Sequence, residues 1–233
     1  MIQILQDWNE VGNAVMALDR RHLPLHFTTQ KNWDHYLISQ WLEKKPKDIN
    51  IIDLGCGEGD TLRLLAALGF SNVYGMDLSI PIKLRLKQLI SLFRKRTFRL
   101  PFHLRKGSIV HTPFSNEFFD LAISVSVIEH DVSLNSLFSE VFRMIKPGGQ
   151  FFITTDYWEK EMDTSTVRVY RAPWRIFSRE KIVQLIQTAK DNGFGLSSND
   201  KIPLCGQKTV RWQNREYTFI AFLFTKIRHQ PPL

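Results

Sequence analysis

The sequence predicts an open α/β sheet of about seven strands, mostly parallel, with helices on both faces and an antiparallel hairpin at its C-terminal edge. From residue 50 onward, short apolar and β-branched runs alternate with stretches of helical periodicity, as expected when each helix connects two neighbouring parallel strands. After residue 192 this alternation ends, and two strand-like runs at 194–204 and 216–226 follow each other across a polar stretch. Two such runs in succession predict the hairpin.

The composition is that of one globular domain. The chain has 233 residues, 43% of them hydrophobic and 23% charged, which provides enough apolar material for a sizeable core. Its longest apolar run, residues 118–128, is interrupted by Asp120 and is too short to span a membrane. The amphipathic N-terminus lacks the order of a secretion signal, and Cys56 and Cys205, the two cysteines, fit a reducing compartment without a disulfide framework. We therefore expect a cytoplasmic protein.

Two helices are predicted ahead of the first strand. Apolar residues recur at three- and four-residue spacings through residues 1–21 and again through residues 33–44, which is the period of an amphipathic helix. Pro46 follows the second stretch closely and ends it. We expect residues 1–47 to form a helical cap or lid near the ligand edge of the sheet, and residues 48–233 to form the main domain as a single unit.

The central part of the chain supplies most of the sheet. Apolar and β-branched runs predict strands at residues 50–54, 71–77, 101–105, 118–125 and 150–155. Helical periodicity predicts helices at residues 58–68, 80–96 and 133–145. Pro81 lies in the first turn of the second helix, where proline is tolerated, and Pro147 with the two glycines after it stops the third.

The pattern changes after residue 155. Residues 156–173 have no clear period and are rich in tyrosine, tryptophan and charged residues, so we expect a loop or lid over residues 156–177. Residues 178–192 follow as a helix with charged residues in its first turn. If the loop folds over the ligand edge, its aromatic residues either wall an apolar acceptor or belong to the core; they are Tyr170, Trp174 and Phe177.

Glycine occupies every other position directly after the first strand, at Gly55, Gly57 and Gly59. Glycine allows positive φ and leaves no Cβ between the backbone and a ligand, and helix-forming residues follow the turn at once. A strand that ends in such a turn beneath a helix N-terminus is a site for a ligand that needs close backbone contact.

Two nucleotide-binding motifs can be compared with this turn. A dinucleotide site has Gly-x-Gly-x-x-Gly, and Asp60 replaces the third glycine here, which argues against a nicotinamide-dependent dehydrogenase. A P-loop is excluded because the chain has no Gly-Lys-Ser/Thr sequence. Asp77 ends the second strand, beside the turn, where a carboxylate can accept both hydroxyls of a ribose.

Four segments stand in order along residues 48–155. They are Asp53-Leu54-Gly55-Cys56-Gly57-Glu58-Gly59, Gly75-Met76-Asp77-Leu78-Ser79, Phe119-Asp120-Leu121-Ala122-Ile123-Ser124 continuing to Ile128-Glu129-His130, and Ile145-Lys146-Pro147-Gly148-Gly149. Together they resemble the motifs of class I S-adenosylmethionine-dependent methyltransferases, and more narrowly the small-molecule type that includes the ubiquinone and menaquinone biosynthesis enzymes. The resemblance implies a Rossmann-like fold, S-adenosyl-L-methionine as cofactor, S-adenosyl-L-homocysteine as product, and methyl transfer to a small-molecule acceptor.

The resemblance also implies roles for single residues. Asp53 would hold the turn or the methionine amino group, Asp77 would bind the ribose hydroxyls, and Leu78 would pack on the adenine. Ser108 stands where the family usually has an acid that meets the adenine amino group, so it would accept that hydrogen bond more weakly. The implied cofactor-binding residues are Asp53, Gly55, Cys56, Gly57, Gly59, Asp77, Leu78, Ser108, Ile109 and Ser126.

The implied reaction needs mainly alignment from the protein. A sulfonium methyl, which Ser126 would face, is already activated, so the enzyme aligns a nucleophile in line with it and excludes water. A general base is needed only if the nucleophile must lose a proton. Glu129 and His130 follow the fourth strand on the ligand edge. Either His130 is that base, or it is structural and Glu129 caps a helix or contacts the methionine end. No metal is predicted, because the remaining histidines lack metal-ligand spacing.

The net charge of +8 is concentrated in residues 83–106, which hold nine lysines and arginines and no acidic residue. We favour a solvated helix face followed by a basic loop. The alternative is a surface for an anionic partner such as RNA, a phosphorylated substrate or lipid headgroups, which leaves open an RNA methyltransferase or a non-catalytic nucleotide- or RNA-binding module. The chain reads Ser124-Val125-Ser126-Val127 where amino-methylating DNA enzymes have Asn-Pro-Pro-Tyr, which argues against nucleobase amine methylation.

Overall fold

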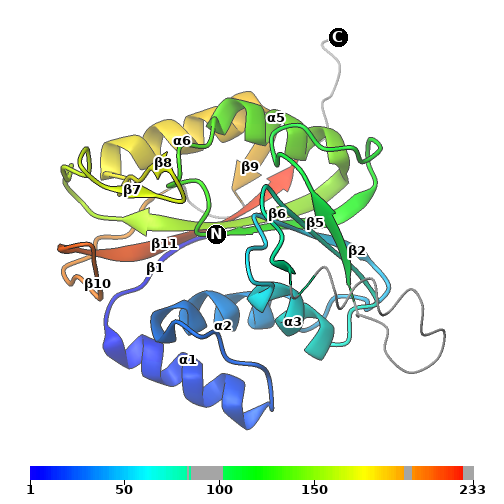
Figure 1. Ribbon diagram of the computed structural model, residues 1–233, viewed down its shortest axis with the longest axis horizontal. Helices are drawn as coiled ribbons and strands as arrows, with labels where there is room; N and C mark the ends of the chain where they lie inside the picture. The colour runs from blue at the N-terminus through cyan, green and yellow to red at the C-terminus, as the bar shows by residue number, and fades with distance from the viewer. Residues whose placement is uncertain (83, 85–101, 197–200, 228–233) are drawn as a thin grey trace.

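The computed structural model describes residues 1–82, 84, 102–196 and 201–227. These residues build one large sheet in the order β1-β11-β6-β5-β2-β3-β4, with β9 and β10 paired to β11. Helices α5 and α6 cover one face of the sheet, and α1, α2 and α3 cover the other (Figure 1). The predicted open α/β sheet with helices on both faces is therefore confirmed.

The centre of the sheet is parallel. Its strands are β2 (Asn50–Leu54), β3 (Asn72–Asp77), β4 (His103–Lys106), β5 (Phe119–Val125) and β6 (Ile145–Tyr157), and all four pairs of neighbours among them run parallel. Asp53 lies opposite both Gly75 and Ile123 in the register. The carboxyl ends of β2, β3 and β5 consequently meet at one edge of the sheet, which is the ligand edge in folds of this kind.

The helices that follow these strands begin where the sequence predicts. They are α3 (Asp60–Ala67), α5 (Leu134–Met144) and α6 (Arg179–Asp191). Ser133 and Ser178 cap α5 and α6, because each side chain accepts a hydrogen bond from the backbone N–H three residues on. Strand β6 is longer than predicted: it starts at Ile145 and includes Pro147 and both glycines, which were expected to lie before the strand.

The N-terminal helix prediction is wrong at its start. Residues Ile2–Ile4 form strand β1, which pairs antiparallel with residues 220–222 of β11. The helix α1 (Trp8–Arg20) begins after Asp7, whose Oδ1 accepts a hydrogen bond from the N–H of Glu10 (3.0 Å). The 3₁₀ helix η1 (Thr29–Lys31) and α2 (Asn32–Trp41) follow. The apolar spacing of the first five residues fits a strand as well as a helix, and the pairing with β11 decides it.

The C-terminal part closes the sheet with antiparallel strands. Strand β11 (Arg215–Lys226) runs antiparallel to β6, and the hairpin partner is β10 (Val210–Trp212). Gln213 and Asn214 connect the two with φ of +49° and +55°, as in the two-residue turns that match strand twist. Of the strand predicted at 194–204, Phe194–Leu196 form β9 and residues 201–204 are not in a strand, while residues 197–200 lie outside the described residues.

Several predictions fall on less regular or undescribed residues. Asp156 and Tyr157 belong to β6, and the expected loop contains a small ribbon of β7 (Arg168–Val169) and β8 (Ala172–Pro173). Most of the predicted helix at 80–96 and most of the basic segment lie outside the described residues. Among the residues that the structure does describe, no helix combines the length and apolar character needed to cross a bilayer.

Candidate cofactor and acceptor site

The glycine turn after β2 lies tightly between two strands. The N–H groups of Gly55 and Cys56 both donate to the carbonyl oxygen of Met76 on β3 (2.8 and 3.2 Å). Gly55 has φ of +81°, and a Cβ built on it would come within 2.4 Å of Cγ2 of Val127, just after β5. Gly57 also has positive φ (+45°), but a Cβ there would meet nothing within 4 Å. The turn is thus packed at Gly55 and open at Gly57.

Asp77 lies beside the turn, as the sequence predicts. Its Oδ2 accepts a hydrogen bond from the N–H of Gly57 (2.9 Å), and its Oδ1 accepts one from the N–H of Ser79 (2.8 Å). The N–H of Gly107 donates to the backbone oxygen of Asp77 (2.9 Å), which brings the segment after β4 to the same place. A carboxylate held in this way by two amides retains lone pairs for ribose hydroxyls.

The predicted adenine-side residues differ in their exposure. Leu78 is 70% exposed, so its side chain is free to cover the adenine ring of a cofactor. Ile109, in contrast, is buried in the hydrophobic core. Ser108 Oγ accepts a hydrogen bond from the N–H of Val110 (3.3 Å). The structure therefore gathers Asp77, Leu78 and Ser108 at one end of the turn, and their cofactor roles stay predictions.

Asp53 is a buried acid at the end of β2. Burial, with help from the charges of Asp77 and Asp60, raises the pKa of Asp53 to about 8. Its Oδ2 accepts no hydrogen bond from the described residues. A buried carboxyl with one oxygen that lacks a hydrogen bond, beside an open turn, fits the ammonium group of the cofactor's methionine. Cys56 is different: burial raises the pKa of its thiol, so it packs in the core as a neutral group.

A segment of the N-terminal region 1–47, in which no site residue was predicted, crosses the turn. His26 Nε2 lies 3.8 Å from Oδ2 of Asp60, at the start of α3. Five residues later, Nζ of Lys31 donates a hydrogen bond to Oγ of Ser126, at the end of β5. Residues 26–31 therefore pass from one side of the glycine turn to the other. No local signal marks Lys31, because Ser126 is far away in the sequence.

Three buried acids lie near Lys31, and we call Asp34, Glu129 and Asp156 the acid cluster. Oδ2 of Asp34 is 3.5 Å from Nζ of Lys31. Oε2 of Glu129 accepts a hydrogen bond from Oγ1 of Thr155 (3.1 Å), and Oδ2 of Asp156 accepts one from Nε1 of Trp174 (2.8 Å). All three residues are at most 5% exposed, so their carboxyl groups lie inside the protein.

Burial dominates the ionisation of the acid cluster. It raises the pKa of Glu129 to about 8 and the pKa of Asp156 to about 6, and it also raises the pKa of Asp34. The Lys31 ammonium acts against burial at all three carboxyls. Glu129 and Asp156 interact, so the cluster shares protons near neutral pH.

His130 is a weak base in this setting. Burial and then the charge of Lys31 lower the pKa of His130 to about 4, and its Nδ1 makes no hydrogen bond within the described part of the chain. A neutral imidazole with this pKa fits the structural interpretation of His130 better than the general-base interpretation. Tyr170, 5.4 Å away by ring centroids, is 87% exposed, whereas Trp174 and Phe177 are buried.

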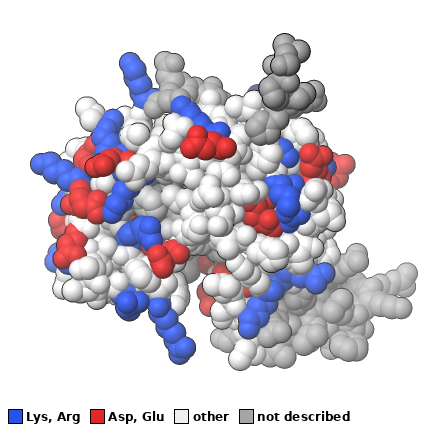
Figure 2. Space-filling view, turned by 90° about the horizontal axis from the view of Figure 1, so that it is seen from above, with Lys and Arg blue, Asp and Glu red and all other residues white. Residues whose placement is uncertain are grey.

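The described residues do not form a separate basic patch on the face shown in Figure 2. Of the basic segment, Arg105 and Lys106 are described, and they belong to β4. Figure 2 shows lysines and arginines interspersed with aspartates and glutamates over the face that it presents. In residues 1–82, 84, 102–196 and 201–227, no group of three His, Cys, Asp or Glu side chains is arranged to hold a metal ion.

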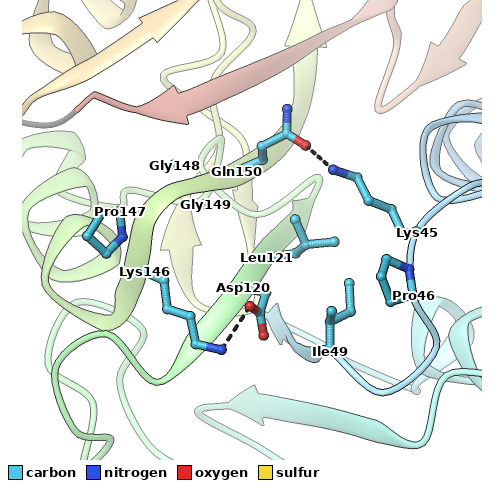
Figure 3. A pocket seen from close by; sticks show the side chains of 10 residues that line it. All are labelled: Lys45, Pro46, Ile49, Asp120, Leu121, Lys146, Pro147, Gly148, Gly149 and Gln150. Carbon is cyan, nitrogen blue, oxygen red and sulfur yellow. Dashed lines mark hydrogen bonds and ion pairs between the residues drawn. The ribbon is translucent and has the colours of Figure 1, made fainter.

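A cavity of about 270 Å³ opens at the opposite edge of the sheet. It lies between the loop after α2 and the start of β6 (Figure 3). Nζ of Lys45 donates a hydrogen bond to Oε1 of Gln150, and Nζ of Lys146 donates one to Oδ1 of Asp120. Each of these two hydrogen bonds is 2.8 Å long. The cavity contains none of the predicted cofactor residues, so it is distinct from the glycine turn.

Known proteins resemble this chain in sequence. A family model described as a methyltransferase domain matches residues 52–153. Sterol 24-C-methyltransferase erg6 of Schizosaccharomyces pombe is 25% identical over 175 residues, which cover 72% of this chain and 45% of that protein. The 24-methylenesterol C-methyltransferase 2 of Oryza sativa subsp. japonica is 31% identical over 114 residues, which cover 49% of this chain and 30% of that protein. The chain thus spans less than half of the length of these two relatives.

Solved structures resemble it in fold. The geranyl diphosphate C-methyltransferase from Streptomyces coelicolor A3(2), solved with Mg²⁺, geranyl diphosphate and S-adenosyl-L-homocysteine, superposes with a TM-score of 0.62 at 16% identity. The superposition covers 88% of this chain and 86% of that one. At this identity the likeness shows the fold alone.

Proposed function

Because residues 52–153 form a class I S-adenosylmethionine-dependent methyltransferase domain, a family whose cofactor is S-adenosyl-L-methionine, we propose that this protein transfers a methyl group to an apolar small-molecule acceptor. The observation that supports it best is the pairing of Asp77 with the open position at Gly57. A ribose-binding carboxylate and a turn without side-chain bulk lie next to each other there.

On the cofactor side, each residue has a limited task. Asp77 binds the ribose hydroxyls, and Asp53 faces the methionine ammonium with its partnerless oxygen. Leu78 and Ser108 receive the adenine. The bound cofactor supplies an activated methyl group, so the chain itself has to align the acceptor and exclude water.

On the acceptor side, the acid cluster favours a neutral nucleophile. A methyl group that arrives on a neutral carbon or nitrogen makes the acceptor positively charged, and buried carboxyl groups that ionise in response to it stabilise such a charge. An anionic nucleophile such as a phenolate would be repelled. The names of the relatives, sterol and geranyl diphosphate C-methyltransferases, support an acceptor with an apolar body and carbon as the accepting atom.

Calorimetry with S-adenosyl-L-homocysteine tests the cofactor site. We expect the wild-type protein to bind it, and Asp77→Ala to bind at least about tenfold more weakly, since a charged group loses its ligand hydrogen bonds. Asp163→Ala is the matched control, because Oδ1 of Asp163 also accepts an N–H two residues on, from Ser165 (2.9 Å), on an exposed loop. No binding by the wild type, or equal binding by Asp77→Ala, would contradict the proposal.

A further inference from the structure

We propose that, in the free protein, the Lys31 ammonium lies where the positive charge of the methyl-transfer reaction would form. Binding of S-adenosyl-L-methionine then displaces the ammonium. The inference rests on the proposed function and adds a residue from outside the methyltransferase domain to the site. It makes Lys31 a positioning residue that sets the preference between the charged cofactor and its neutral product.

The position of Lys31 is the first argument. Its ammonium donates to Oγ of Ser126, and the next residue, Val127, lies against Gly55 of the glycine turn. The side chain of Lys31 is 12% exposed, so the ammonium lies inside the protein. On the far side of the turn, His26 meets Asp60. The segment 26–31 therefore crosses the turn with its positive charge at the end nearest to β5.

The surroundings of the ammonium are the second argument. Nζ lies 3.3 Å from the centroid of the Phe219 ring, and an aromatic face attracts a cation. Asp34 lies 3.5 Å away and is fully buried, and neither of its oxygens accepts a hydrogen bond of good geometry from the described residues. Such a carboxylate is costly to bury unless a positive charge accompanies it.

The number of acids near Lys31 is the third argument. Glu129 and Asp156 are also within electrostatic reach, because Lys31 acts against the effect of burial at both carboxyls. One ammonium faces three buried carboxyls. The three carboxyl groups can therefore stabilise one positive charge at this position, whether a lysine or a ligand carries that charge.

With Ser126 facing the sulfonium, as the resemblance implies, methyl transfer would move a positive charge past the Lys31 ammonium. The electron pair of a neutral nucleophile forms the bond to the methyl carbon, and the electrons of the broken carbon–sulfur bond stay on sulfur. The sulfur becomes neutral, and the positive charge passes to the acceptor until a proton leaves. A lysine ammonium at the same position would repel both cations at short range. Lys31 consequently has to leave when the charged cofactor enters, and it can return once the neutral product remains.

The test compares the cofactor with its product, which differ by one methyl group and one charge. Calorimetry would measure the affinity of the wild type and of Lys31→Met for S-adenosyl-L-methionine and S-adenosyl-L-homocysteine. We expect Lys31→Met to bind the charged cofactor about tenfold more tightly than the wild type, with less than about a twofold change for the product. Lys31→Arg keeps the charge and should behave as the wild type.

Lys146→Met is the matched control, because Lys146 pairs with Asp120 at the opposite edge of the sheet. An equal change in the affinity for cofactor and product in Lys31→Met would overturn the inference. If the wild type binds neither compound, the proposed function fails instead, and the two failures are distinguishable.

A second measurement uses the wild-type protein and needs no variant to fold. Acetylation of lysines by an N-hydroxysuccinimide ester, followed by mass spectrometry, reports the accessibility of each ammonium. We expect Lys31 to react faster with S-adenosyl-L-methionine bound than with S-adenosyl-L-homocysteine bound, whereas Lys146 reacts equally in both. Equal reactivity of Lys31 in the two complexes would show that the ammonium is not displaced.

Discussion

The side chain of Val127 lies so close to Gly55 that a Cβ on Gly55 would stand 2.4 Å from Cγ2 of Val127. The end of β5 and the turn after β2 are therefore in direct contact, with no space for a side chain between them. Two positions further, at Gly57, a Cβ would meet nothing within 4 Å. One glycine is thus required by packing within the protein, and the other leaves room that a ligand can fill.

Alanine substitutions should separate these two requirements. We expect Gly55→Ala to lower the free energy of unfolding by about 2–4 kcal/mol, from positive φ and steric overlap. We expect Gly57→Ala to cost about 1 kcal/mol, from its φ alone, yet to weaken S-adenosyl-L-homocysteine binding at least about tenfold. Urea unfolding and calorimetry measure the two effects. Comparable losses of stability in both variants would show that Gly57 is not open.

Cofactor binding should depend on pH through Asp53. Its pKa is about 8 in the free protein, and a neighbouring ammonium favours the ionised carboxylate. Binding at pH 7 therefore releases a proton, and the affinity for S-adenosyl-L-homocysteine rises between pH 6 and 8, by up to about tenfold per pH unit. Calorimetry in buffers with different heats of ionisation counts the released protons.

Asp53→Asn is the control for this linkage. The variant keeps the shape of the side chain but has no proton to release, so we expect its affinity to be nearly independent of pH over the same range. The assignment of Asp53 would be wrong if the variant and the wild type showed the same pH dependence.

Two glutamates, Glu129 and Glu140, should make the free energy of unfolding depend on pH in opposite directions. Glu129 has a pKa of about 8 in the folded protein and of 4.5 in the unfolded chain. Between these two pH values the folded state binds more protons than the unfolded state. The free energy of unfolding therefore falls as pH rises, by up to about 1.4 kcal/mol per pH unit. Glu140 pairs with Arg143, whose hydrogen bonds lower the pKa of Glu140 to about 2. Its contribution is present above pH 4.5 and is lost as pH falls toward 2.

Urea unfolding of glutamine variants at several pH values would measure both pH dependences. We expect Glu129→Gln to flatten the loss of stability between pH 5 and 8. We expect Glu140→Gln to be less stable than the wild type at pH 7, by about 1.5–3 kcal/mol for a charge-assisted hydrogen bond, with the difference shrinking near pH 2. A stability that rises between pH 5 and 8 for the wild type relative to Glu129→Gln would refute the raised pKa.

Local sequence patterns explain why the meeting of Asp77 with the glycine turn was predictable. The β-branched run 50–54, the alternating glycines and Asp77 each carry a signal that neighbouring residues supply. The structure places Asp77 on the N–H of Gly57 as the strand order requires. The contact needs only two adjacent parallel strands, so a correct alternation of strands and helices is enough to predict it.

The surroundings of Lys31 depend on contacts that no local pattern contains. Lys31 meets Ser126, just after β5, and Phe219 on β11, both far along the chain. Asp34 reads as an ordinary polar residue of an amphipathic helix, and its burial arises from packing against the sheet. Residues 2–4 show the same limit, because their apolar spacing fits a helix and pairing with β11 makes them a strand. Tertiary contacts override local preference in each case.

The place of β11 between β6 and β1 also sets the order in which the protein can assemble. Residues 2–4 pair with residues 220–222, and contacts so distant in sequence form late. Until Arg215–Lys226 leaves the ribosome, β6 keeps an open edge and Lys31 has no Phe219 ring to rest on. The glycine turn, built from β2 and β3, needs none of these C-terminal contacts, whereas the surroundings of Lys31 are complete only once β11 has paired with β6.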